Sequence, residues 1–362
     1  MVMREKYIIY GAGKTGKTLL KHLKENGIDV ICFIDRNHPG HLDGKTVYDL
    51  KSIPLSLLQE HVILALHNDV LGAARSLKEL GFSFLHTLAG VNLLLEADGK
   101  DIFRYNHTPL DSAKLIANRD IYSLKSLLED DISRDIVENY CSYIRTGRIE
   151  FLRKHDSGPM YFSDNRPYEC SSPLFYVDCG AYTGDTIEIF NKNLKLDTVV
   201  AFEPDPDNFM ILRKNLRKML SPDTKVFTLE SGVGVKNSIV SFSQAQDGSA
   251  ISETGTAKVA ITTLDKLLIN QPVNFIKMDI EGSEKDALMG AREVITQYAP
   301  LLAISAYHSL SDFFEVPQLI HKLNPNYKLY LRSHNDSFHD TVCYAVPERF
   351  MRKHQTRTFR TP

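Results

Sequence analysis

Acidic residues and glycines that directly follow short apolar segments give the clearest chemical pattern in this chain. The apolar segment that starts at Leu174 runs into Asp178, which stands two residues before Gly180 in the spacing DxGxxxGD. A carboxylate at this point would repel a pyrophosphate, whereas it can accept from an ammonium group. The glycines let the backbone approach a ligand closely. The pattern therefore favours a ligand with a cationic group over a dinucleotide.

A second acid follows the next predicted strand. Residues 198–202 end in Glu203, which lies 203 − 178 = 25 residues after Asp178. An acid at this place can accept from both hydroxyls of a ribose. One acid for the ammonium of an amino acid and one for a ribose together describe S-adenosylmethionine (SAM). The residues predicted to bind this cofactor are Asp178, Gly180, Ala181, Tyr182, Thr183, Gly184, Glu203 and Asp279.

Three residues after the fourth and fifth strands of this region are predicted to be catalytic. The fourth strand ends in Asp279, with Glu281 close behind, and the fifth is followed by His308. Ligands of an open parallel sheet bind beyond the carboxyl ends of the strands, so these side chains are expected in the same crevice as Asp178. They could orient a substrate hydroxyl or act as general base. No metal site is assigned, although oxygen ligands of this kind can also hold a metal.

Other polar residues near these strand ends have simpler explanations. Glu284 is expected to stabilise the start of a helix through the helix dipole. Ser283 and Asp286 have the spacing of a capping box.

Arg332 and His334 belong to the predicted last pair of strands, from which they could reach a substrate.

A glycine-rich turn near the start of the chain matches two phosphate-binding patterns. Gly11, Gly13 and Gly16 form GxGxxG, and residues 11–18 also form GxxxxGKT. Both patterns place backbone N–H groups at the start of a helix, where an anionic phosphate is stabilised. Asp35 ends the next strand, 22 residues after Gly13, where a dinucleotide fold has a ribose acceptor. This distance favours a Rossmann-type site.

The alternative P-loop enzyme needs a separate magnesium-binding acid, and the predicted strand over 61–67 ends without one. We therefore predict a second nucleotide site at Gly11, Gly13, Gly16 and Asp35. This region resembles the N-terminal sugar-nucleotide-binding domain of bacterial sugar acyltransferases in residues 10–13, 33–35 and 44–47. The alternative that the glycines only form a tight turn stays open.

Two regions alternate short apolar runs with amphipathic stretches, which is the βαβ pattern of parallel sheets. At roughly 150 residues per domain, 362 residues correspond to about 2.4 domains. We predict an α/β fold with two doubly wound sheets. Its parts are a small Rossmann-like domain over 1–90 with three or four strands, a helical connector over 91–171 with helices over 110–128 and 134–152, a second sheet domain over 172–347, and a tail over 348–362.

Composition limits the function and the partners. Lys and Arg total 43 and Asp and Glu total 45, so the net charge is 43 − 45 = −2, which argues against nucleic acid as a partner. The five cysteines lie at wide spacings without a CxxC pair, as in reduced cytosolic proteins. No apolar run approaches the ~20 residues of a membrane span, and the first residues do not have the pattern of a signal peptide. We expect a cytoplasmic protein, and a homo-oligomer is compatible with the sequence.

The region over 172–347 resembles the FkbM-type SAM-dependent methyltransferases. The matching stretches, in order and spacing, are 177–186, 202–209, 248–251, 263–265, 275–284 and 306–308. Residues 160–162 resemble the lead-in of bacterial members with an N-terminal nucleotide-fold domain. The resemblance implies the seven-stranded class I methyltransferase sheet with an antiparallel last strand. It also implies methyl transfer from SAM to a hydroxyl oxygen, typically on a sugar or a secondary metabolite.

These observations predict a SAM-dependent O-methyltransferase whose acceptor is a small molecule, a sugar nucleotide or a glycan. The substrate hydroxyl would attack the methyl group in line, with Asp279 or His308 taking its proton. One alternative is a nicotinamide-dependent sugar-nucleotide oxidoreductase or epimerase, but the chain lacks a clear Tyr-x-x-x-Lys pair near the first loop. Another is a non-catalytic SAM or nucleotide sensor, and the acid-rich strand ends favour an enzyme over it.

Overall fold

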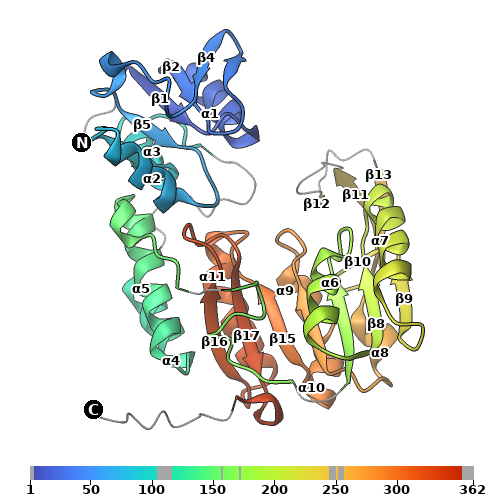
Figure 1. The fold of residues 1–362 in the computed structure, drawn as a ribbon. Helices are drawn as coiled ribbons and strands as arrows, with labels where there is room; N and C mark the ends of the chain where they lie inside the picture. Colours follow the sequence, from blue (N-terminus) through green and yellow to red (C-terminus); the bar gives the residue numbers. More distant parts are fainter. Residues whose placement is uncertain are drawn as a thin grey trace, which may run out of the picture.

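The computed structural model describes residues 4–103, 116–155, 158–170, 173–243, 250–251 and 257–352. Figure 1 shows an N-terminal sheet with its helices in blue, followed by a helical segment in green and a second large sheet that runs through to red. The α/β class and the presence of two parallel-rich sheets are as predicted. Within the described residues, no helix has a stretch long and apolar enough to cross a lipid bilayer.

The N-terminal sheet has six strands in the order β3-β4-β2-β1-β5-β6. They are β1 (Lys6–Tyr10), β2 (Asp29–Ile34), β3 (Gly40–Leu42), β4 (Lys45–Tyr48), β5 (Val62–Leu64) and β6 (Leu85–Thr87). The connecting helices are α1 (Lys14–Glu25), α2 (Val70–Glu79) and α3 (Leu88–Ala97). The sheet exceeds the three or four strands expected because β3, β4 and β6 are only three or four residues long and lack an apolar run.

The connector consists of α4 (Asn118–Leu127) and α5 (Asp131–Thr146). Helix α5 begins earlier than predicted because the side chain of Asp130 accepts from the backbone N–H of Ser133. It also ends earlier, because Gly147 adopts a left-handed conformation with φ of 63°, which is a common helix stop. Residues 110–115 of the first predicted helix lie outside the described residues.

The C-terminal sheet has seven strands in the order β16-β17-β15-β14-β7-β8-β9. They are β7 (Leu174–Cys179), β8 (Leu196–Phe202), β9 (Lys225–Leu229), β14 (Phe275–Met278), β15 (Leu301–Ser305), β16 (Lys328–Ser333) and β17 (Thr341–Val346). Strand β17 is antiparallel to both of its neighbours, and the other pairs are parallel. The predicted seven-stranded sheet with an antiparallel last strand is confirmed.

Helices cover both faces of this sheet, so its central strands are buried on both sides. The helices are α6 (Asp185–Asn193), α7 (Pro206–Met219), α8 (Leu264–Leu268), α9 (Glu284–Met289), α10 (Arg292–Tyr298) and α11 (Leu310–Leu323). Every residue of β14 and β15 is buried. The long apolar runs of the sequence therefore correspond to strands in the middle of the sheet.

A small four-stranded sheet, which the sequence did not predict, is inserted between β9 and α8. Its strands are β10 (Gly232–Val233), β11 (Ser238–Ser243), β12 (Ala250–Ile251) and β13 (Ala257–Thr262), in the order β10-β13-β11-β12. Phe242, Val259 and Ile261 form its core. Gly248 and Ser249 of the family-like stretch lie outside the described residues.

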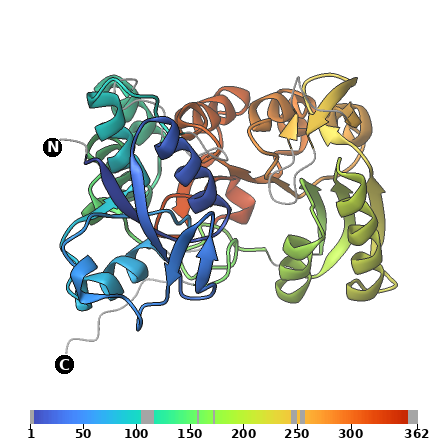
Figure 2. The same ribbon diagram turned by 90° about the horizontal axis from the view of Figure 1, so that it is seen from above.

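The carboxyl ends of the two large sheets face each other. Strands β15 and β16 are both antiparallel to β17, so the loop over 334–340 lies at the carboxyl edge of the C-terminal sheet. In this loop, Asp336 Oδ2 accepts from the backbone N–H of Leu71 at 2.7 Å, and Nε2 of His339 lies 2.9 Å from Nδ1 of His67. Both partners follow β5 of the N-terminal sheet. Seen from above, the N-terminal domain covers the β16 side of the C-terminal sheet and not the β9 side (Figure 2).

Arg332 connects the C-terminal sheet to the connector. Its side chain is buried, with one guanidinium nitrogen 2.6 Å from Asp130 Oδ2 and another 3.1 Å from Ser133 Oγ. The third, Nε, donates to the carbonyl oxygen of Asn165 at 2.6 Å. All three guanidinium nitrogens are thus bonded to protein groups, so the expectation that Arg332 reaches a substrate is wrong. The side chain instead fixes the start of α5 on β16.

We predict that Arg332→Leu lowers the free energy of unfolding by about 3 kcal/mol, because it leaves buried acceptors and the Asp130 carboxylate without their partner. Urea denaturation measures this loss. Lys192→Ala is the control, since Lys192 pairs with Glu188 on the exposed face of α6 and its removal should cost at most about 0.5 kcal/mol. Equal losses in the two variants would contradict this role of Arg332.

Candidate functional site

The glycine-rich turn after β7 brings the ends of two central strands together. Gly180 has a φ of 79°, and a Cβ atom on it would lie 2.0 Å from the carbonyl oxygen of Asp279. Only glycine fits at such a close approach of two backbones. Tyr182 also has a positive φ of 47° and an exposed ring. Gly184 follows with a φ of 90° and starts α6.

A buried ion pair lies directly beneath this turn. Nζ of Lys277, on β14, is 3.0 Å from Asp178 Oδ1 and donates to the carbonyl oxygen of Gly180 at 2.8 Å. The hydroxyl of Tyr176 donates to Asp178 Oδ2 at 3.0 Å. Burial alone would lower the pKa of Lys277, but the neighbouring carboxylates of Asp178 and Asp279 raise it, so the side chain stays an ammonium. Both oxygens of Asp178 thus contact protein groups.

Sequence reasoning missed Lys277, although a signal for it was present. Lys277 is the single charged residue within β14, whose four residues are all buried. A buried ammonium needs a carboxylate partner, and Asp178 stands opposite it in the register of β14 and β7. The Asp178 carboxylate is completely buried beneath the turn. That Asp178 receives the ammonium of a ligand stays a prediction.

Glu203 lies beside the glycine turn, at the end of β8. Its Oε2 accepts from the backbone N–H of Tyr182 at 2.8 Å, and its Oε1 accepts from that of Asp205 at 2.9 Å. The side chain is buried, and burial raises the pKa of Glu203 to about 7. Asp205 caps α7, with Pro206 in the first turn. Glu203 is therefore held against the turn by backbone amides.

A cluster of acids surrounds His308 at the ends of β14 and β15. Nε2 of His308 lies 3.2 Å from Asp279 Oδ1 and 3.8 Å from Glu281 Oε2, and Nδ1 lies 3.1 Å from Glu284 Oε1. Burial would lower the pKa of His308, but Glu284 and Asp279 raise it well above its usual value. The Tyr307 hydroxyl donates to Asp279 Oδ1 at 3.1 Å. Of the predicted catalytic residues, His308 thus contacts both Asp279 and Glu281.

Glu284 is the member of this cluster that sequence reasoning missed. It is completely buried, and its Oε1 accepts from the backbone N–H of Ile280 at 2.8 Å. An acid in the first turn of a helix is common on exposed helices, so its position alone gave no signal of a buried role. The expected capping box is wrong as well, because the side chain of Ser283 makes no capping hydrogen bond.

The first glycine loop has the shape that the sequence predicts. Gly11 has a φ of 104°, and a Cβ atom on Gly16 would lie 1.9 Å from the carbonyl oxygen of Gly11. Gly13 differs, because a Cβ atom on it would meet nothing within 4 Å. Asp35 lies next to the loop, where its Oδ2 accepts from the backbone N–H of Ala12 at 2.7 Å. Gly11, Gly16 and Asp35 therefore shape the turn, and Gly13 leaves open space above it.

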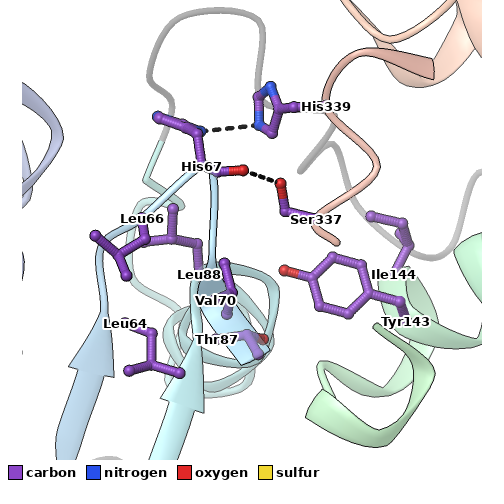
Figure 3. Close-up of a pocket in the computed structure, with 10 residues that line it drawn as sticks. All are labelled: Leu64, Leu66, His67, Val70, Thr87, Leu88, Tyr143, Ile144, Ser337 and His339. Atoms are coloured by element: carbon purple, nitrogen blue, oxygen red, sulfur yellow. Dashed lines mark hydrogen bonds between the residues drawn. The ribbon is translucent and has the colours of Figure 1, made fainter. Parts of the chain in front are cut away.

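A chain of side chains links this loop to the acid cluster. Thr15 Oγ1 lies 2.9 Å from Nε2 of His67, whose Nδ1 is bonded to His339. Figure 3 shows His67 and His339 pointing toward one another above a small pocket between the two domains, with Ser337 also bonded to the His67 carbonyl oxygen. The His339 ring lies 5.9 Å from that of Tyr307, which contacts Asp279.

Comparison with known proteins agrees with this geometry. Residues 178–335 match the family model described as methyltransferase FkbM domain. This segment contains the second glycine turn, Glu203 and the acid cluster, so the likeness to the FkbM methyltransferase domain covers the residues of the candidate site. No protein of the curated set matches the chain.

Solved structures extend the likeness to the whole fold. The crystal structure of methyltransferase FkbM from Methylobacillus flagellatus KT has a TM-score of 0.74 and 23% sequence identity, over 94% of this chain and 90% of that one. The precorrin-6Y C5,15-methyltransferase from Geobacter metallireducens GS-15 has a TM-score of 0.32 and 14% identity, over 50% of this chain and 83% of that one. An rRNA methylase from Streptococcus thermophilus has a TM-score of 0.32 and 13% identity, over 50% and 88%. The first likeness shows a shared fold, and the other two are too distant for further use.

Proposed function

We propose that the chain transfers the methyl group of SAM to a hydroxyl oxygen of a small molecule, a sugar nucleotide or a glycan. One observation carries this proposal. The glycine turn with Glu203 and the cluster around His308 lie at the carboxyl edge of the same sheet, where Gly180 touches the backbone of Asp279. A cofactor on the turn and an acceptor at the cluster would therefore be neighbours.

The residues around the glycine turn fit SAM, which supplies a methyl group on a positively charged sulfur. Glu203 would accept the ribose hydroxyls, because each of its oxygens has one backbone amide as partner and a carboxylate oxygen has room for a second donor. The exposed ring of Tyr182 offers a face for stacking. Asp178 and Lys277 together fix the glycine turn, and through this turn Asp178 would position the ammonium group of SAM.

Asp279 is the residue that we propose as acceptor of the substrate proton. Its side chain is 27% exposed, whereas that of His308 is 2% exposed. Burial would raise the pKa of Asp279, but the hydrogen bond and charge of His308 hold it well below its usual range. An ionised carboxylate can orient the attacking hydroxyl, and much of the rate gain would come from this alignment. His308 would support Asp279 from beneath.

Incubation with labelled SAM and a panel of sugar nucleotides, glycans and small hydroxylated molecules tests the activity. We expect a labelled product and a loss of kcat of at least about 100-fold in Asp279→Asn, because a positioned acid-base group contributes that much. Asp286→Asn, on the exposed face of α9, is the control and should keep full activity. SAM binding without transfer to any acceptor would instead support a sensor, and nicotinamide binding would support an oxidoreductase.

The affinity for SAM should depend on pH through Glu203. Because the carboxyl has a raised pKa of about 7 in the free protein and only the carboxylate accepts from both ribose hydroxyls, the dissociation constant should level off above pH 7. Below pH 7 it should rise by up to about tenfold per pH unit. Calorimetric titrations between pH 5.5 and 8.5 measure this change.

Glu203→Gln should weaken binding and remove the dependence on pH. Asp207→Asn is the matched control, because Asp207 is an exposed acid in the first turn of α7. Unchanged affinity in Glu203→Gln would show that Glu203 does not hold the ribose.

We infer a separate role for the N-terminal domain, which would bind the anionic part of a nucleotide-linked sugar and present its hydroxyl to Asp279. The loop at the start of α1 carries Lys14 and Lys17, and the first turn of that helix contains no acid. A phosphate would be favoured there. The facing carboxyl edges and the contact from Thr15 through His67 to His339 direct this loop toward the acid cluster.

Gly13→Trp tests this role without disturbing the turn. Gly13 has an ordinary extended backbone, and its Cβ position is open, so an indole would fill the space above the loop. We expect a higher KM for nucleotide-linked acceptors and an unchanged affinity for SAM. Lys21→Trp on the exposed face of α1 is the control. If Gly13→Trp methylates every tested acceptor normally, the domain has only a structural role.

A further inference from the structure

The cluster around His308 has the composition of a metal site. One ligand atom from each of Asp279, Glu284 and His308 lies within 4.8 Å of the others. The Glu281 carboxylate adjoins them, with Oε2 at 3.8 Å from His308 Nε2. Two separate strand ends supply these groups, since three follow β14 and His308 follows β15. Their convergence is therefore a product of the fold and not of sequence proximity alone.

Glu284 gives a second observation that points to a ligand. Its side chain is completely buried, and Oε1 already contacts His308 Nδ1 and the N–H of Ile280. Oε2 is buried too and has no hydrogen-bond partner among the described residues. A buried carboxylate oxygen without a partner is costly. A cation bound beside it would remove that cost.

We propose that Asp279, Glu284 and His308 bind one divalent cation, with Glu281 at the open side of the site. The catalytic role of the ion rests on the proposed function, whereas binding of the ion can be tested independently of that function. Carboxylates suit magnesium and manganese, whereas imidazole suits transition metals. Two carboxylates and one imidazole therefore favour a manganese-type ion. The Asp279 and Glu281 side chains are 27% and 33% exposed, which leaves their side of the ion open to an oxygen from outside.

The ion would act on the acceptor of the methyl group. A hydroxyl oxygen bound to a divalent cation loses its proton more easily. With Asp279 bound to the ion, the neighbouring Glu281 would replace Asp279 as the acceptor of that proton. The oxygen then forms a bond to the methyl carbon while the carbon–sulfur bond of SAM breaks, so that S-adenosylhomocysteine leaves with the bonding electron pair. The ion keeps its oxidation state. An acceptor with two neighbouring hydroxyls could bind to it through both oxygens, as sugars can.

Manganese binding to the full chain tests the site directly. After treatment with a chelator and its removal, titration with Mn²⁺ followed by electron paramagnetic resonance should show one ion per chain. Glu284→Gln and Asp279→Asn should each weaken binding by at least about tenfold. Glu293→Gln changes an exposed acid on α10 and should bind as the unchanged chain does. Because Glu284 is buried, the partly exposed Asp279 provides a variant that is expected to fold.

The result separates this proposal from the proposed function. One tight ion that both variants lose supports the site, even if no acceptor is methylated. Absence of tight binding, or equal binding in all variants, overturns the site even if methyl transfer continues in the presence of chelator. Calorimetry with SAM on the metal-free chain checks that the cofactor pocket is intact in every variant.

Discussion

The buried ion pair of Lys277 and Asp178 is the interaction on which the geometry of the site depends. It joins the neighbouring central strands β7 and β14, and the same ammonium holds the carbonyl oxygen of Gly180. The desolvation of two charges makes such a pair a weak source of stability. Its effect here is one of position, because it fixes the turn that contacts Glu203 on one side and the backbone of Asp279 on the other. Cofactor residues and cluster residues thus share one anchor.

Much of the fold could be predicted because the strongest signals of the sequence are local. Apolar strands that end in an acid or a glycine gave the positions of β1, β7, β8 and β14, and the parallel pattern then placed their carboxyl ends together. The signals fail where structure depends on distant partners. Among the described residues, the core of the small sheet of β10 to β13 has three buried apolar side chains, so its periodicity is weak.

The site shows the same limit at the level of single residues. Asp279, Glu281 and His308 could be predicted because they follow strands, and such positions meet at one edge of a sheet. Glu284 lies further beyond β14, in the first turn of α9, and only the fold brings His308 against it. Arg332 also lies near the carboxyl end of a strand, β16, but its guanidinium binds Asp130 at the start of α5. Position along a strand therefore predicts the edge at which a residue lies, and not the direction of its side chain.

The charges at this edge of the sheet restrict the protonation and metal-bound states that the cluster can adopt. Asp279, Glu281 and Glu284 are three carboxylates around one imidazole, and Lys277 beneath them is shared with Asp178. Carboxylates this close together need positive charge between them. A proton on His308 supplies one unit, and a divalent ion bound to a neutral imidazole supplies two. The second arrangement balances more of the charge and also gives the free oxygen of Glu284 a partner. Because Asp279 and Glu281 are partly exposed, the group that balances the charge of the cluster is also the group that an acceptor hydroxyl would meet first.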